Sequence, residues 1–368
     1  MVSLYIHIPF CKKKCPYCHF YVIADKECFK DELLIGLQLE WQRILPQLAG
    51  KTIDTIYFGG GTPTLFGVKR IAAVLELIQS HFRIGPEVEI TIETNPEEPI
   101  DYKSLRAHGI NRLSFGIQSL HENELAILGR GHSPKESLHA VHSAHSAGFD
   151  NITIDLMYDL PEQTLASWQK SLKRAAQLPI THLSLYNLTI EPHTAFERKE
   201  KALRQKMPDE ESSVKMYSMA QEHLLAHGFC QYEISAFCRD NLYSRHNIGY
   251  WTGRHFFGLG PSSFSFDGER RFRNVANLLR YCKQLLAGTT PIDFAESLSP
   301  QKQKKELLAL QLRLMEGADL KRFQPIEDET LKAINQLVDS GLLQVNNDQV
   351  QMTSRGILFY DTIATEII

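Results

Sequence analysis

Three cysteines near the start of the chain have the spacing with the clearest chemical meaning in this sequence. Cys11, Cys15 and Cys18 are separated by three residues and then by two. Thiolates at such short spacing can hold three corners of one cubic iron–sulfur cluster, and ferredoxin-type sites add a fourth cysteine. This loop offers no fourth cysteine. One iron is therefore expected to lack a protein ligand, which leaves it open to chelation by a small molecule.

The same stretch also fits two other cofactors. Residues 15–19 read Cys-Pro-Tyr-Cys-His, the pattern of covalent haem attachment in c-type cytochromes. That interpretation leaves Cys11 without a role and requires export, whereas the first ten residues lack the basic and apolar regions of a signal peptide. A four-coordinate zinc ion held by the three cysteines and His19 is the second alternative, and the spacing leaves it open.

Composition narrows the class of protein. Of 368 residues, 43% are hydrophobic and 23% charged, which is ordinary for a globular protein. The net charge of −3 gives no basic excess for nucleic acid. No apolar run approaches the roughly 18 residues of an integral membrane segment. We therefore expect a cytoplasmic protein, and its odd count of seven cysteines argues against a disulfide framework in a reducing compartment.

Most of the chain alternates a short β-rich run with an amphipathic helical pattern. The expected strands cover residues 4–8, 55–58, 88–93, 112–115, 152–156 and 182–186, and the expected helices cover 30–45, 69–81, 102–108, 134–147 and 165–178. Six β/α units in succession predict an α/β fold with a parallel sheet. If the sheet curls, its active site gathers at the carboxyl ends of the strands.

Unusual residues follow those strand ends one after another. The cysteines follow the first strand and the run Gly-Gly-Gly-Thr-Pro-Thr (59–64) follows the second. Glu93 ends the third strand, Gln118 follows the fourth, Asp155 lies on the fifth, and residues 187–191 follow the sixth. Because these ends meet at one rim, we expect the side chains to form one site.

The sequence divides into three parts. Residues 1–235 are expected to form the sheet and its cluster loop, residues 236–296 a connecting segment, and residues 297–368 a separate domain. In that domain, helices at 302–315 and 328–339, a capping Gly341 and two short strands around Gln344 and Val350 resemble a winged-helix module. Such modules often bind DNA, but no basic stripe is present, so a lid or interaction domain is expected.

The cysteine loop, with Tyr17 before its last cysteine, is similar to the signature of the radical S-adenosylmethionine (SAM) superfamily. Motifs at 5–11, 57–64, 114–118, 154–157, 183–186 and 258–261 resemble the branch that contains HemW and the oxygen-independent coproporphyrinogen III dehydrogenase. The resemblance covers nearly the whole chain in the same motif order. It implies a partial (β/α)6 barrel, a [4Fe-4S] cluster on the three cysteines, SAM on the open iron, and a flavodoxin- or ferredoxin-type reductant protein.

The resemblance also implies which residues contact SAM. They are Tyr5, Tyr17, Gly60, Gly61, Thr62, Glu93, Gln118, Arg130, Asp155, Thr189 and Phe264. Physical arguments support three of them: Gly60 and Gly61 allow close backbone approach, and an unpaired Glu93 carboxylate on a buried strand is costly without a ligand. The structural alternatives are a plain turn for the glycine run, a surface turn for Arg130, and a helix-capping or strand-end role for Asp155.

A second motif implies a tetrapyrrole ligand. Residues 245–251, Arg-His-Asn-Ile-Gly-Tyr-Trp, resemble the H-N-x-x-Y segment of HemW proteins, which is associated with haem. The resemblance assigns haem contacts to His246, Asn247 and Tyr250. A neutral imidazole is a common axial ligand of haem iron, and aromatic rings offer flat apolar faces. The alternative is a hydrogen-bonded structural histidine.

Two functions follow from the resemblance. One is a chaperone that binds haem and delivers it to an acceptor protein; the other is oxidative decarboxylation of coproporphyrinogen III, a porphyrinogen. The chain has Phe20 where the dehydrogenase loop has a further cysteine, and its cluster loop begins early, at Cys11. Both features, together with the H-N-x-x-Y segment, favour the chaperone. His19 stands where HemW proteins usually have an acidic residue, and a haem-degrading methyltransferase is a third alternative.

Overall fold

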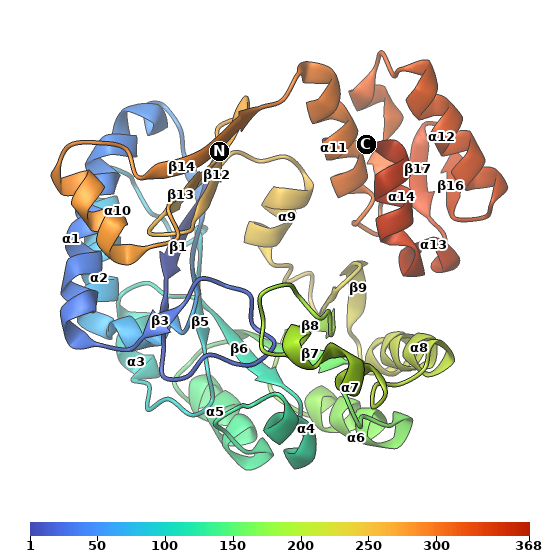
Figure 1. The fold of residues 1–368 in the computed structure, drawn as a ribbon, viewed down its shortest axis with the longest axis horizontal. Helices are drawn as coiled ribbons and strands as arrows, with labels where there is room; N and C mark the ends of the chain where they lie inside the picture. The colour runs from blue at the N-terminus through green and yellow to red at the C-terminus, as the bar shows by residue number, and fades with distance from the viewer.

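The chain folds around one large curled sheet with helices on its outer face, as the computed structural model of residues 1–368 shows (Figure 1). The six expected strands are all present and pair in parallel, in chain order. They are β1 (Val2–Ile8), β4 (Ile53–Gly60), β5 (Glu89–Thr94), β6 (Arg112–Gln118), β7 (Asn151–Tyr158) and β8 (His182–Asn187). The predicted α/β fold is therefore confirmed.

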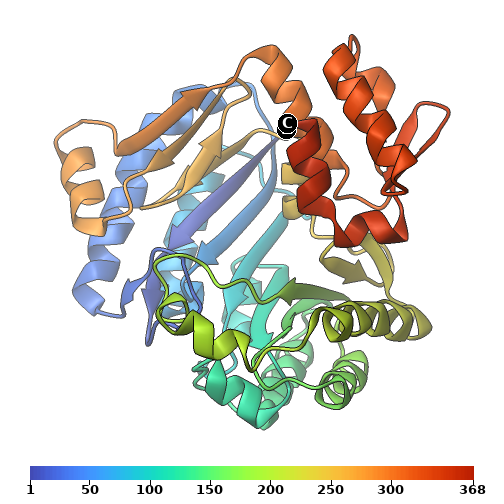
Figure 2. The ribbon, with the colours of Figure 1, turned by 45° about the vertical axis from the view of Figure 1, so that its right-hand side comes forward.

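Helices cross over between these strands and cover the outer face of the sheet (Figure 2). The five expected helices are α1 (Glu27–Ile44), α2 (Val68–Gln79), α3 (Tyr102–Ala107), α5 (Pro134–Ser146) and α6 (Leu165–Ala176). Capping boxes begin two of them, at Ser133 for α5 and at Thr164 for α6, which fixes where each strand-to-helix turn ends. A further short helix, α4 (Glu122–Ile127), lies between β6 and α5 and precedes Arg130.

The two faces of the strands differ in chemistry. On β1, Leu4 and Ile6 belong to the apolar core under the helices, whereas Ser3, Tyr5 and His7 alternate with them and face the inside of the curl. The other central strands alternate in the same way. Parallel strands buried on both faces usually read as continuous apolar runs. The alternation therefore gives this barrel a polar interior instead of a packed apolar one.

Residues 230–297 extend the sheet at both edges. The added strands are β9 (Cys230–Glu233), β10 (Ala236–Cys238), β11 (Phe256–Leu259), β12 (Phe264–Phe266), β13 (Arg270–Asn274) and β14 (Ile292–Ser297). β11 pairs in parallel with β1, and β10 pairs antiparallel with β8. Residues 236–296, expected as a connecting segment, thus contribute to the main sheet. These strands have three to six residues, too few for periodicity to identify them.

A buried glutamate joins the extension to α1. Glu40 is 3% exposed, and its carboxylate accepts hydrogen bonds from Gly260 N (2.8 Å), Tyr281 Oη (2.5 Å) and Asn274 Nδ2 (2.5 Å). Tyr281 lies on α10 (Leu278–Leu286), which packs on α1. Burial raises the pKa of Glu40 to about 7, although these three donors lower it in part.

This raised pKa predicts a pH-dependent stability that Glu40→Gln should remove. Between the ordinary pKa of 4.5 and about 7, the folded chain holds a proton at Glu40 that the unfolded chain releases, so stability falls as pH rises. The group contributes at most about 3 kcal/mol of that fall. Urea unfolding from pH 4.5 to 8 should show a flatter profile for Glu40→Gln than for the exposed control Glu222→Gln. Parallel profiles would contradict the prediction.

The C-terminal residues form a smaller domain with its own apolar core. It contains the predicted helices α11 (Pro300–Gln311) and α12 (Asp328–Asp339) and the predicted hairpin β16 (Leu343–Asn346) and β17 (Gln349–Met352). Gly341 follows α12 with a φ of 71°, as expected of a helix-ending glycine. Unforeseen elements are β15 (Ala318–Asp319), α13 (Ser354–Leu358) and α14 (Tyr360–Ile367).

The small domain covers the open side of the curl, where the short helix α9 (Arg245–Trp251) lies between the two bodies (Figure 1). Arg313 makes the junction: its guanidinium pairs with Glu233 at 3.3 Å and lies 4.3 Å from the centre of the Trp251 ring. The division of the chain at residues 235 and 296 stays a prediction. None of the helices combines the length and the apolar character needed to cross a bilayer.

Candidate cluster and cofactor site

The cysteine loop lies over the carboxyl ends of the central strands and is fastened at both ends. Two short parallel strands, β2 (Phe10–Cys11) and β3 (Ile23–Ala24), close its base. At its tip, Pro16 O accepts a hydrogen bond from Phe196 N at 2.9 Å, and the Tyr17 ring packs 6.2 Å from the Phe196 ring. The loop thus reaches from the end of β1 to the segment that follows β8.

The three thiols are free, half-buried and available as ligands. Burial raises the pKa of Cys11 to about 11 and raises that of Cys18, so a metal must displace protons to bind here. No three His, Cys, Asp or Glu side chains converge on a single-ion position, and the exposed His19 packs on Phe20 at 4.6 Å. Thiolates on different irons of a cubane lie farther apart than ligands of one zinc ion. The donor set fits the cluster and offers no preformed zinc site.

Arg130 links the cysteine loop to the neighbouring strands. Its guanidinium donates to Cys15 Sγ at 3.5 Å and, at 2.6 Å each, to Asn95 Oδ1 and Gly116 O. The structural alternative for Arg130, an exposed turn, is therefore wrong: the turn after α4 directs the side chain inward. Its positive charge stands beside a cluster thiol, where it stabilises the thiolate form.

The chain of contacts continues to a second cysteine. Asn95 Nδ2 donates to Thr62 Oγ1 at 2.8 Å, and Thr62 Oγ1 lies 3.9 Å from Cys11 Sγ. Thr62 follows β4 and Asn95 follows β5, so two strand ends hold one side of the loop. No motif in the sequence points to Asn95. Its position between Arg130 and Thr62 gives it a role.

The glycine run after β4 is required by the protein's own packing. A Cβ on Gly60, whose φ is 114°, would lie 2.6 Å from the His7 ring, and a Cβ on Gly61 would lie 2.5 Å from Phe10 O. The backbone therefore passes closely over β1 and the base of the loop. Gly61 N also donates to Ile8 O at 2.8 Å. These contacts bring the residues expected to contact SAM up against the cysteine loop.

Two half-buried carboxylates face the inside of the barrel below this rim. Glu93 accepts hydrogen bonds from Tyr57 Oη (2.9 Å) and Gly60 N (3.1 Å), so it has internal partners in addition to any ligand. Asp155 accepts one from Ser114 Oγ at 3.4 Å. Burial raises the pKa of Glu93 to about 7 and that of Asp155 to about 6. A cationic or hydroxyl-bearing ligand would stabilise both ionised forms.

The remaining expected SAM contacts are spread along the rim. Tyr5 Oη lies 3.1 Å from His7 Nδ1, inside the curl and beside Tyr57. Gln118 ends β6 with a φ of 70°, a left-handed conformation that is uncommon outside glycine. Thr189 is exposed after β8, and Phe264 is 41% exposed at the start of β12. No hydrogen bond joins Thr189 or Phe264 to the connected residues, and their SAM role stays a prediction.

The His-Asn-x-x-Tyr segment forms α9, and its histidine is 1% exposed. His246 Nδ1 bonds Thr55 Oγ1 at 2.7 Å, and Nε2 bonds Tyr250 Oη at 2.9 Å. Burial lowers the pKa of His246 to about 3, so the ring is neutral. Both ring nitrogens are occupied, which matches the structural alternative. A haem role for His246, the half-buried Asn247 and Tyr250 stays a prediction that requires one of these bonds to break.

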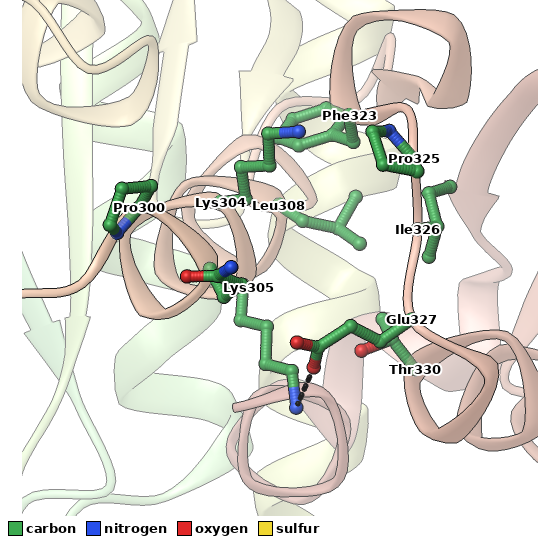
Figure 3. A pocket seen from close by; sticks show the side chains of 10 residues that line it. Pro300, Lys304, Lys305, Leu308, Phe323, Pro325, Ile326, Glu327 and Thr330 are labelled. Atoms are coloured by element: carbon green, nitrogen blue, oxygen red, sulfur yellow. Dashed lines mark ion pairs between the residues drawn. The ribbon is translucent and has the colours of Figure 1, made fainter.

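A separate pocket lies in the small domain (Figure 3). It has a volume of about 250 Å³ and is lined by Pro300, Gln301, Lys304, Lys305, Leu308, Phe323, Pro325, Ile326, Glu327 and Thr330. Its two lysines already have partners: Lys305 pairs with Glu327 at 3.1 Å, and Lys304 donates to Gln324 O at 2.8 Å. A carboxylate thus neutralises Lys305, and a backbone carbonyl holds Lys304.

Comparison with known proteins agrees with this geometry. The Radical SAM superfamily profile matches residues 5–175, and the HemN C-terminal domain profile matches residues 298–359. The chain is 33% identical to heme chaperone HemW of Mycobacterium tuberculosis, covering 100% of this chain and 94% of that protein. It is 32% identical to heme chaperone HemW of Bacillus subtilis, covering 97% of each.

Among solved structures, the coproporphyrinogen III oxidase HemN of Escherichia coli, a radical SAM enzyme, superimposes with a TM-score of 0.87. The match covers 100% of this chain and 89% of HemN at 25% identity. Radical SAM membership implies a [4Fe-4S] cluster and SAM, which the three thiols and the rim residues suit. The chain belongs to the HemW family of the radical SAM superfamily.

Proposed function

We propose that this chain binds haem and passes it to an acceptor protein, using a radical SAM barrel that holds a [4Fe-4S] cluster and SAM. The observation that carries the proposal is the full-length identity of 33% and 32% to two proteins named heme chaperone HemW. The cluster loop adds support, because Phe20 stands where the dehydrogenase carries a further cysteine. We place this activity in the cytoplasm.

Oxidative decarboxylation of coproporphyrinogen III is the second candidate, and one observation favours it. The backbone superimposes on that of HemN over the whole chain with a TM-score of 0.87. The identity to HemN is 25%, below that to the two chaperones. A barrel with the cluster, SAM and an added electron could begin this reaction, so only a turnover measurement separates the two functions. The electron would come from a flavodoxin- or ferredoxin-type partner.

The deciding experiment is anaerobic and has two arms. In the first, reconstituted protein is incubated with SAM, a reductant and coproporphyrinogen III, and protoporphyrinogen IX is measured; we expect none. In the second, haem is titrated into the same preparation and followed by absorbance; we expect saturable binding of one haem per chain. Authentic HemN serves as the positive control for turnover.

Each outcome decides between the candidates. Saturable haem binding without turnover supports the chaperone, and transfer of the bound haem to an apo-haem protein would complete the case. Protoporphyrinogen formation at a rate comparable to that of HemN would refute it and establish the dehydrogenase. Absence of both activities in protein with a full cluster would remove both proposals.

A further inference from the structure

Arg112 is a buried cation without a partner. It is the first residue of β6, 2% exposed, and faces the inside of the barrel, because its neighbour Leu113 lies in the apolar core under the outer helices. Its Nε has no hydrogen-bond partner, and it forms none of the ion pairs of the molecule. Arginine keeps its charge in proteins, and a buried charge without a counter-ion is costly.

The residues beside Arg112 on the two neighbouring strands also carry a buried polar atom without a hydrogen-bond partner. Thr91 on β5 and Asn151 on β7 are its register partners. Thr91 Oγ1 and Asn151 Oδ1 are buried and also lack hydrogen-bond partners. Three adjacent strands thus present a hydroxyl, a guanidinium and an amide in one row. Unsatisfied groups are rare in folded proteins, and three in one row indicate a ligand or ordered water.

The row lies below the level of the expected SAM contacts. Ser114, two residues along β6 from Arg112, bonds Asp155, so Arg112 stands about 7 Å deeper along the strand. The charge of Arg112 acts across the interior: it lowers the pKa of Asp155, of Tyr57 and of His246, on three different elements. Asp155 is the nearest carboxylate in this set, and no carboxylate lies within ion-pair distance of the guanidinium, so its direct partner is missing.

We propose that Arg112, with Thr91 and Asn151, binds a carboxylate of the ligand that occupies the barrel, and that this carboxylate is a propionate arm of a tetrapyrrole. A planar guanidinium matches a carboxylate in two hydrogen bonds, and the flanking Thr91 hydroxyl can donate to the same oxygens. Asn151 donates through Nδ2, with its amide turned so that the oxygen faces away from the carboxylate. This inference rests on the proposed function, which supplies a ligand with two such arms. SAM is the other carboxylate source, and its carboxylate is expected on the open iron.

The test combines a variant with a change in the ligand. Wild type, Arg112→Gln and Arg112→Lys are titrated with haem and with haem dimethyl ester, in which both carboxylates are masked. Wild type should bind haem at least about 10-fold more tightly than Arg112→Gln does, the strength expected of a charged hydrogen bond. The ester should bind both proteins equally, and Arg112→Lys should fall between them. SAM affinity should be the same in all three proteins.

The outcomes separate this inference from the proposed function. If wild type binds no haem, the proposed function fails. If wild type binds haem and its ester equally, the inference fails while the function stands, and this arm needs no variant that must fold. If Arg112→Gln weakens SAM binding and leaves haem affinity unchanged, the carboxylate belongs to SAM and the tetrapyrrole assignment is wrong. Ligand-free Arg112→Gln should melt no lower than wild type, because it removes an unpaired charge; a clear loss would show a purely structural arginine.

Discussion

Replacing Cys11, Cys15 and Cys18 together by serine is expected to abolish iron binding. Anaerobically reconstituted wild type should contain about four irons per chain, and the triple variant close to none. Thiolates bind the irons of a cubane, and the rest of the site offers no equivalent set: Arg130 brings a positive charge to Cys15, and Thr62 contributes a hydroxyl near Cys11. Iron and sulfide analysis measures the change.

A matched control uses cysteines outside the loop. Cys28 and Cys230 are exposed and free, so a Cys28→Ser, Cys230→Ser double variant should retain the full cluster. SAM should perturb the EPR spectrum of the reduced cluster in wild type and in this control, because one iron has no protein ligand. Stoichiometric zinc in wild type, lost with the same three cysteines, would contradict both the cluster and the radical SAM chemistry derived from it.

The sequence alone predicted the central sheet well because its signal is local. Each central strand alternates an apolar outer residue with a polar inner one, and each crossover helix has an apolar face with its own start signal, as at Ser133. Because the carboxyl ends of these parallel strands meet at one rim, the sequence also predicted that the cysteines, Glu93 and Gln118 lie there. The same alternation places Arg112 on the inner face, beside Leu113 on the outer one.

Contacts between distant segments could not be predicted. Arg130 has the sequence surroundings of a surface turn. Only the close approach of the turn after α4 to the cysteine loop, at Gly129 and Pro16, brings it to Cys15 and Asn95. The pairing of β11 with β1 joins residues about 250 positions apart in the chain. The haem role implied for His246 rests on a motif, and a motif records only residue types. The motif does not record that Thr55 occupies one ring nitrogen.

Replacing His246 by alanine should destabilise the ligand-free chain by about 2–4 kcal/mol. The change removes a buried ring that packs 4.8 Å from the Tyr57 ring, and it leaves Thr55 Oγ1 and Tyr250 Oη without their shared partner. Denaturant unfolding of cluster-free protein should show a lower midpoint with an unchanged slope. His19→Ala, at an exposed position of the cysteine loop, is the control and should leave stability unchanged.

A second single variant, Tyr250→Phe, distinguishes a structural role of His246 from ligation of haem iron. That variant removes only the hydroxyl bound to His246 Nε2 and keeps the ring that packs edge-on against Phe256 at 4.7 Å. If His246 ligates haem iron, freeing Nε2 should maintain or raise haem affinity, while His246→Ala abolishes the ligand's contribution to the Soret spectrum. If His246 is structural, both variants lower stability and neither changes the haem spectrum. Both ring nitrogens of His246 already have hydrogen-bond partners, and ligation would require one of these bonds to break. We therefore expect the second result, in which other groups hold haem.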